Sequence, residues 1–178
     1  MKEIRTLTQI MARLRGPRGC PWDQKQTHKT LRPMLLEEVY ELLEAIDQKD
    51  DEALQEELGD VLLHIIFHSQ LAQERRAFNF QKVAKQLAEK LVSRHPHVFG
   101  KERLATTQQV LKRWHQLKEA EKPTRQSCLD GIPLHLPSLL LAQNLQKRAA
   151  RVGFDWPNPE KGIPAKIREE IKEVCQTK

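Results

Sequence analysis

Apolar residues recur at intervals of three and four along most of this chain, the spacing that places them on one face of an α-helix. In the clearest case, Leu35, Val39, Leu42 and Ile46 follow one another at steps of four, three and four. A second stripe of the same kind runs over residues 54–72. No alternating apolar and polar run of the kind that predicts a strand ladder accompanies them. The sequence therefore predicts an all-α fold.

Short polar residues stand just before most of these stripes, where they are expected to cap the helices: Thr27 or Thr30, Asp50 or Asp51, Asn79, and Thr106 or Thr107. Pro33 is expected near the start of its helix or at a kink, because proline inside a helix costs about 3 kcal/mol. The stretches GPRGCPWD and HPHVFG are expected loops, rich in Gly and Pro. The two helices that carry the stripes over residues 35–46 and 54–72 are joined by so short a connection that they should pack antiparallel.

The chain of 178 residues is divided by its composition. Residues 1–122 are expected to form a helical unit, residues 123–137 a Pro-rich linker, and residues 138–178 a helical extension. Pro137 should open the helix of this extension, and Gly153 should end it. The extension finishes with an EExxE run at Glu169, Glu170 and Glu173, which repeats the spacing of an earlier run and looks like the start of a second copy.

Two acidic clusters lie inside the apolar patterns about one helix length apart, and they consist of Glu37, Glu38 and Glu41, and of Glu56, Glu57 and Asp60. Residues three and four apart share a helix face, so two antiparallel helices bring four or more of these carboxylates to one place. Carboxylates confined together repel one another unless a cation joins them. A hard divalent metal such as Mg²⁺, carrying a polyphosphate, is the expected ligand.

Other readings of these residues stay open. A single EExxE run is usually solvated helix surface. A di-iron site is the rival metal centre, but it needs a His three residues after a Glu, and no His of this chain has that neighbour. Asp60, His64 and His68 are spaced by four and share a face, yet a packed or hydrogen-bonded histidine is favoured over a metal ligand.

The net charge of +6 hides an uneven distribution, since residues 30–75 hold 12 acids and 3 bases. The excess of Lys and Arg in the rest of the chain is compatible with nucleic-acid binding. The acidic segment, however, makes a small polyanion the favoured partner. No apolar run reaches the length of about 20 residues that a membrane span needs. The three cysteines are scattered and suggest reduced thiols in the cytoplasm. Apolar faces on so short a helical set suggest a homodimer or a higher homo-oligomer.

Five runs in the chain resemble the MazG family of nucleoside triphosphate pyrophosphohydrolases: CPWDQKQTH, LLEEVYELLEAI, EELGDVLLHIIFH, KLVSRHPHVFG and GFDWP. The resemblance covers roughly residues 4 to 175. It implies an all-α, MazG-like helical bundle, completed by dimerisation. It also implies hydrolysis of (deoxy)nucleoside triphosphates to monophosphate and pyrophosphate with Mg²⁺, or alternatively Mn²⁺.

The resemblance also implies roles for particular residues. The family's EExxE falls on Glu37, Glu38 and Glu41, and its ExxD falls on Glu57 and Asp60; these five are the expected metal ligands, with Glu38 or Glu41 as the catalytic group that activates water. Lys90 and Arg94 resemble its triphosphate contacts, and Trp114 and Lys118 resemble its base-stacking and phosphate-binding pair. The alternatives are helix surface for the two basic residues of the first pair and a core position for the tryptophan.

The chain departs from the family pattern in its last part, because no ExxD follows the second EExxE. Half a metal site should not hold Mg²⁺ well. The sequence therefore leaves two functions open. One is hydrolysis through the first unit, and the other is a catalytically weak nucleotide-binding or interaction module that retains the fold.

Overall fold

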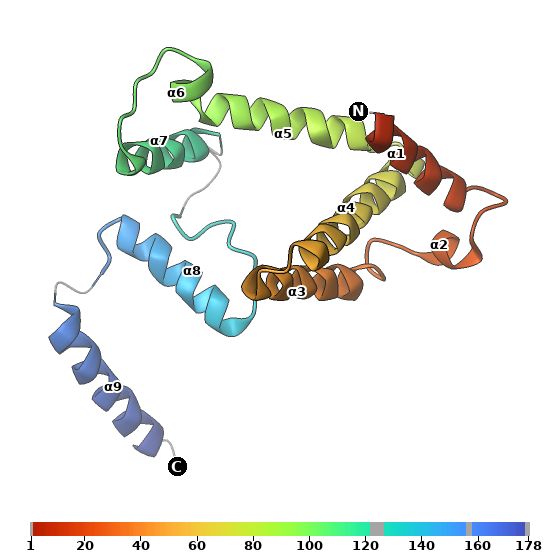
Figure 1. Ribbon diagram of the computed structural model, residues 1–178. Helices are drawn as coiled ribbons and strands as arrows, with labels where there is room; N and C mark the ends of the chain where they lie inside the picture. The colour runs from red at the N-terminus through yellow and green to blue at the C-terminus, as the bar shows by residue number, and fades with distance from the viewer. Residues whose placement is uncertain (1, 122–126, 156–157, 177–178) are drawn as a thin grey trace. The chain divides into compact units, whose positions relative to one another are not determined.

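A computed structural model describes residues 2–121, 127–155 and 158–176 of the chain. Over these residues the chain forms nine helices and no strand, which confirms the all-α fold (Figure 1). The chain divides into two compact units, residues 1–104 and 105–178. Residues 123–126 of the expected linker, and Trp156 and Pro157 of the GFDWP run, lie outside the described residues.

Within its described part, the first unit contains α1 (Lys2–Leu14), α2 (Pro21–Lys25), α3 (Arg32–Gln48), α4 (Asp51–Glu74), α5 (Phe80–Arg94) and α6 (Pro96–Phe99). Helices α3 and α4 form an antiparallel hairpin, as expected (Figure 1). Lys49 ends α3 in the left-handed conformation with φ 57°, and its N–H donates to the carbonyls of Ala45 and Ile46. Asp50 then caps α4 by accepting from the N–H groups of Glu52 and Ala53. The chain thus reverses over two residues.

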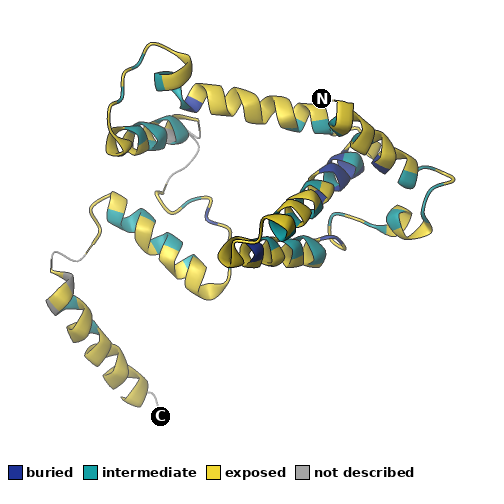
Figure 2. Cartoon of the chain, in the orientation of Figure 1, coloured by how far each residue is buried: buried dark blue, intermediate teal, exposed yellow. Residues whose placement is uncertain are grey.

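The hydrophobic core of this unit lies around the C-terminal half of α4 (Figure 2). Its buried members come from α1, α4 and the residue before α3, and they are Met11, Leu31, Ile66, Phe67 and Leu71. Burying each such side chain contributes about 1.5–3 kcal/mol. The N-terminal half of α4 and most of α3 lie outside this core, so the acidic clusters are presented on a hairpin that the core anchors at one end only.

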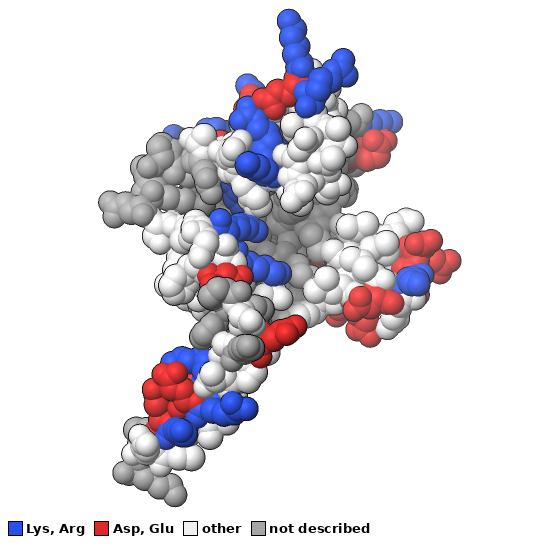
Figure 3. All heavy atoms as spheres, turned by 90° about the vertical axis from the view of Figure 1, so that its left-hand side faces the viewer, with Lys and Arg blue, Asp and Glu red and all other residues white. Residues whose placement is uncertain are grey.

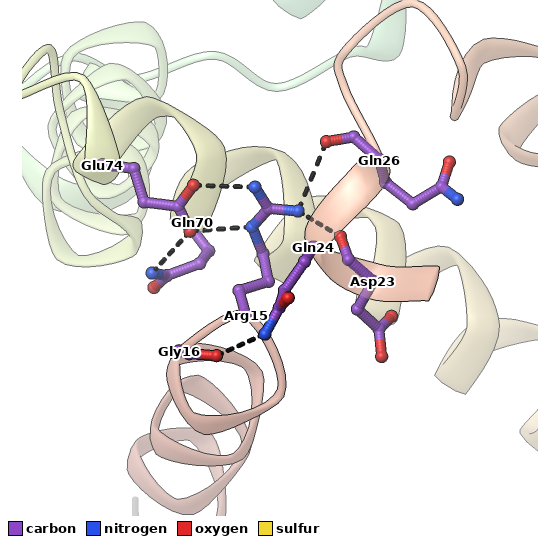
Figure 4. Close-up of polar contacts among 7 residues, drawn as sticks. All are labelled: Arg15, Gly16, Asp23, Gln24, Gln26, Gln70 and Glu74. Atoms are coloured by element: carbon purple, nitrogen blue, oxygen red, sulfur yellow. Dashed lines mark hydrogen bonds and ion pairs between the residues drawn. The ribbon is translucent and has the colours of Figure 1, made fainter. Parts of the chain in front are cut away.

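Arg15 ties the end of α1 to α4 and to the segment around α2 (Figure 4). Its Nε and Nη2 donate to the two carboxylate oxygens of Glu74 over 2.7 and 2.8 Å. Its Nη1 donates to the carbonyls of Asp23 and Gln26, and the guanidinium lies 5.4 Å from the ring centroid of Phe67. A planar fork with five donors suits this arrangement, because it satisfies a carboxylate and two backbone carbonyls together.

Three local expectations are wrong. The stretches GPRGCPWD and HPHVFG are not loops throughout, because the short helices α2 and α6 begin at Pro21 and Pro96; proline is favoured at a first helical position. Neither Thr27 nor Thr30 caps α3. The backbone N–H of each threonine donates to the hydroxyl oxygen of the other, which closes a separate turn, and Leu31 precedes the helix instead. Asn79 caps α5 as expected, by accepting from the N–H of Lys82.

The second unit contains α7 (Thr107–Ala120), α8 (Ser138–Arg151) and α9 (Pro159–Gln176) in its described part. Thr106 caps α7, because its hydroxyl accepts from the N–H of Gln109. Pro137 directly precedes α8, and Gly153 follows it with φ 86°, where glycine carries no steric penalty. None of the described helices has both the length and the apolar character that a membrane crossing requires.

Candidate metal centre

Three carboxylates meet where α3 and α4 run side by side. Glu38 and Glu41 come from α3 and Glu57 comes from α4, and one oxygen of each lies within 4.8 Å of the others. The spacing of three on α3 places its two glutamates on one face, and the antiparallel hairpin brings Glu57 opposite to them. The sequence predicted that four or more carboxylates of these two helices would meet, and three of them do so within this distance.

Electrostatic repulsion is concentrated at this place. Burial raises the pKa of Glu38, and the neighbouring charges of Asp60, Glu41, Glu57 and Glu37 raise it further, in that order. Burial also raises the pKa of Glu57, with Glu41, Asp60 and Glu56 adding to the effect. The charges of the other cluster members therefore act on Glu38, on Glu57 or on both, and three of the six carboxylates bring their oxygens together.

One side-chain oxygen of Glu57 is an unsatisfied acceptor. This atom, Oε2, is buried and has no hydrogen-bond partner among the described residues. A buried anionic oxygen without a partner is costly, and a cation would remove that cost together with the mutual repulsion. Hard divalent ions such as Mg²⁺ bind carboxylate oxygens, so the donor set fits such an ion. Asp60 adds its charge beside the three, whereas Glu37 is exposed.

The four expected substrate-binding residues lie on other helices. Lys90 and Arg94 are on α5, which runs from the C-terminal end of α4 to α6 (Figure 1). Lys90 is exposed, but the Arg94 side chain is buried, with a relative exposure of 9%. Trp114 and Lys118 are half-buried on α7, in the second unit. Their roles therefore stay predictions.

The second acidic run, on α9, has a different environment. Lys166 donates to Glu169 over 2.8 Å and lies 3.3 Å from Glu170. The hydrogen bond to Glu169, followed by that to Glu170, raises the pKa of Lys166. Figure 3 shows acidic and basic side chains next to one another on this helix, at the lower end of the view. Lys166, on the same helix, thus pairs with Glu169 and Glu170, whereas the charges that act on Glu38 and Glu57 of the α3–α4 hairpin come from other carboxylates.

The chain is similar to known proteins along most of its length. Residues 26–99, which contain α3, α4 and α5, match the MazG nucleotide pyrophosphohydrolase domain. The chain is 49% identical to the nucleoside triphosphate pyrophosphohydrolase/pyrophosphatase MazG of Thermotoga maritima over 97% of its length and 66% of that protein. It is 45% identical to a nucleoside triphosphate pyrophosphohydrolase of Escherichia coli over 98% of its length and 67% of that protein. The chain belongs to the MazG family.

The structures agree as well. A crystal structure of a mazG-related protein from Thermotoga maritima matches this MazG chain with a TM-score of 0.54 and 29% sequence identity, covering 65% of this chain and 98% of that one. The MazG chain spans about two thirds of the length of the two curated relatives named above. The resemblance that the five sequence runs carry is thereby confirmed at the level of family and fold.

The structure adds one polar cluster that sequence reasoning missed. His28, in the connection between α2 and α3, places its Nδ1 2.8 Å from the Nδ1 of His68 on α4. Helical spacing had grouped His68 with Asp60 and His64. It gave no signal for His28, because a partner 40 residues away on another segment leaves no periodic trace.

Proposed function

We propose that this MazG chain hydrolyses (deoxy)nucleoside triphosphates to nucleoside monophosphate and pyrophosphate with Mg²⁺. The observation that carries the proposal is the convergence of Glu38, Glu41 and Glu57 in a chain of this family. The relatives named nucleoside triphosphate pyrophosphohydrolases support the substrate class. Mn²⁺ is the alternative ion, since it accepts the same oxygen ligands. Such substrates belong to the cytoplasm, which is the proposed location.

The metal would be held by Glu38, Glu41, Glu57 and Asp60, with Glu37 at the edge. Bound there, it supplies positive charge against the triphosphate and makes a water molecule more acidic. Glu38 is proposed to take the proton from that water, because its carboxylate lies where the metal would be held. Glu41, beside it, is the other candidate for this role.

The bond that breaks is the α–β phosphoanhydride. The oxygen of water joins one of its two phosphorus atoms, its proton passes to the carboxylate, and the electron pair of the broken bond leaves on the bridging oxygen. Lys90, Arg94 and Lys118 are proposed to bind the phosphate oxygens, and Trp114 is proposed to stack on the base. Stacking suits every base, so this set of residues does not by itself select one nucleotide.

The test is pyrophosphate release from a panel of nucleoside triphosphates with Mg²⁺. Glu57→Gln and Asp60→Asn should each lower kcat/KM by a factor on the order of 100 or more, since they remove charge at the metal site. The control is Glu44→Gln, on the same hairpin but exposed, where Gln48 donates to the side-chain oxygen. Full activity in Asp60→Asn would contradict the proposal. Magnesium-dependent nucleotide binding without turnover in the unmodified chain would favour the binding module instead.

The chain is further proposed to act as a homodimer or higher homo-oligomer. Leu36, Tyr40 and Leu43 of α3 are each about half exposed in the single chain. At 100° per residue they lie on the side of α3 opposite to Glu38 and Ala45, which face α4. Soluble monomers seldom expose such stripes, so a second copy is the expected cover.

A further inference from the structure

A hydrogen bond between two histidines joins the start of α3 to α4. The Nδ1 atom of His28, in the connection between α2 and α3, lies 2.8 Å from the Nδ1 atom of His68 on α4. The two rings are nearly parallel, with an interplanar angle of 2° and centroids 5.1 Å apart. We call this pair the histidine bridge. The proposed hydrolysis assigns no role to either residue.

The surroundings of the two rings indicate which of them donates. The Nε2 atom of His28 is buried and has no partner among the described residues. A buried N–H without an acceptor is rarer than a buried acceptor without a donor, so the proton of neutral His28 belongs on Nδ1. Burial lowers the pKa of His68, and the neighbouring rings of His28 and His64 lower it further. His68 is therefore neutral near pH 7 and accepts the hydrogen bond at its Nδ1.

The histidine bridge lies at the end of the α3–α4 hairpin that is opposite to the turn. The turn over Lys49 and Asp50 fixes one end. The bridge and Leu31, which is 1% exposed in the core, hold the other end. The three carboxylates of the candidate metal centre lie between these two ends. A change in the register of the helices at the bridge therefore moves Glu38 relative to Glu57.

We propose that His28 and His68 are positioning residues, whose hydrogen bond sets the register of α3 against α4 and thereby the separation of the carboxylates that hold the metal. The inference rests on the metal site proposed above. Burial of Leu31 holds the helices together, but the hydrophobic effect has no direction. A hydrogen bond has a preferred length and angle, so it fixes what apolar contact leaves free. Such support matters because metal ligands must be held within about 0.5 Å of the productive geometry.

Substitutions that separate the hydrogen bond from the volume of the ring test the proposal. His68→Leu fills a similar volume without a polar atom, whereas His68→Asn places an amide near the position of Nδ1. His68→Leu should weaken Mn²⁺ binding, measured by electron paramagnetic resonance, by about tenfold. It should raise the Mg²⁺ concentration for half-maximal pyrophosphate release by the same factor. His68→Asn should recover most of both losses, and His28→Leu repeats the test if His68→Leu does not fold.

Two control variants separate positioning from a general loss of stability. Ile66→Val removes one methyl group from the core beside the bridge, so it should lower Tm and leave Mn²⁺ affinity unchanged. His135→Leu, at an exposed histidine of the second unit, should change neither quantity. A loss of Mn²⁺ affinity in Ile66→Val as large as in His68→Leu would reduce the bridge to an ordinary packing contact.

Nitrogen NMR of the unmodified chain tests the hydrogen bond itself, without metal or substrate. At neutral pH the ¹⁵N shift of the His28 Nδ1 should be that of a protonated ring nitrogen, and that of the His68 Nδ1 should be that of an unprotonated one. The opposite assignment would exchange donor and acceptor and keep the bridge. Two unprotonated or two protonated Nδ1 atoms would show that the bridge does not form and would overturn the proposal.

The binding and turnover measurements also distinguish this proposal from the proposed function. Unchanged Mn²⁺ affinity and Mg²⁺ requirement in His68→Leu would overturn the positioning role and leave the hydrolysis standing. Mn²⁺ binding without pyrophosphate release in the unmodified chain would overturn the hydrolysis. In that case, weaker Mn²⁺ binding in His68→Leu with recovery in His68→Asn would still support the bridge. An unmodified chain that binds no Mn²⁺ would overturn both proposals.

Discussion

At the scale of single residues, the raised pKa values of Glu38 and Glu57 link the stability of the first unit to pH and to metal. A carboxyl whose pKa is higher in the folded than in the unfolded chain favours folding when protonated. Its contribution is fully present below the unfolded pKa and is lost as the pH rises through the folded pKa. Without metal, these two groups should therefore destabilise the chain between mildly acidic and neutral pH.

Magnesium should reverse this effect, and it should raise Tm most near neutral pH, where the carboxyls are ionised and free to bind it. Thermal melts across this pH range, with Mg²⁺ and with a chelator, measure the difference. In Glu57→Gln the increase should be much smaller. Arg15 lowers the pKa of Glu74, so Glu74 makes the chain more stable as the pH rises, but it does so equally in the unmodified chain and in Glu57→Gln. An equal Mg²⁺-induced rise in Tm in both proteins would contradict the prediction.

Two glycines make a matched pair of predictions with opposite signs. A Cβ on Gly19 would lie 1.9 Å from the carbonyl oxygen of Leu14, which is backbone and cannot move aside. Gly19→Ala should therefore lower the free energy of unfolding by about 1–3 kcal/mol. A Cβ on Gly59 meets nothing within 4 Å inside α4, so Gly59→Ala should raise it by about 1 kcal/mol. Urea unfolding of both variants tests the pair, and a loss of stability in Gly59→Ala would count against it.

At the scale of helices, local chemistry determined what could be predicted. Asp50 and Asn79 cap their helices as expected, because a cap is decided by residues within one turn. Thr27 and Thr30 were equally good caps by composition, but they bond to each other, and this choice depends on the burial of Leu31 in the core. A local pattern carries no information on such a tertiary preference.

The Arg15 contacts could not be predicted at all, since Arg15 and Glu74 are 59 residues apart and neither belongs to a motif. Arg15→Ala should destabilise the first unit by about 2–3 kcal/mol, because it removes charge-assisted hydrogen bonds from a side chain only 8% exposed. Arg15→Lys should recover little of the loss, since an ammonium cannot reach Glu74 and two carbonyls together.

Urea unfolding of the Arg15 variants measures this loss, with Arg13→Ala on the same helix as the control. Arg13 is exposed, so its removal should change the free energy of unfolding by less than about 0.5 kcal/mol. Equal effects of the two alanine substitutions would show that the Arg15 contacts add nothing specific. Recovery of full stability in Arg15→Lys would show that charge alone matters at this position.

At the scale of the whole molecule, the carboxylate site was predictable because its two halves lie on consecutive helices joined by a tight turn. Glu38 and Glu57 are 19 positions apart in sequence, but the hairpin makes them neighbours. The roles of Lys90, Arg94, Trp114 and Lys118 rest on helices beyond this hairpin, and no local turn fixes where those helices lie. They remain predictions because their placement depends on long-range packing and on the proposed association.

The exposed stripe on α3 predicts where a second copy of the chain would bind. Leu43 is 49% exposed in the single chain, so Leu43→Glu should cost a monomer almost nothing. In a dimer that covers the α3 stripe, the same change would bury a charge without a partner and should shift the chain to monomer at micromolar concentration. Leu134→Glu is the matched control, since Leu134 is 82% exposed and lies in the second unit. Sedimentation velocity separates the outcomes: a dimer unaffected by Leu43→Glu would place the interface elsewhere, and a monomeric unmodified chain would remove the need for one.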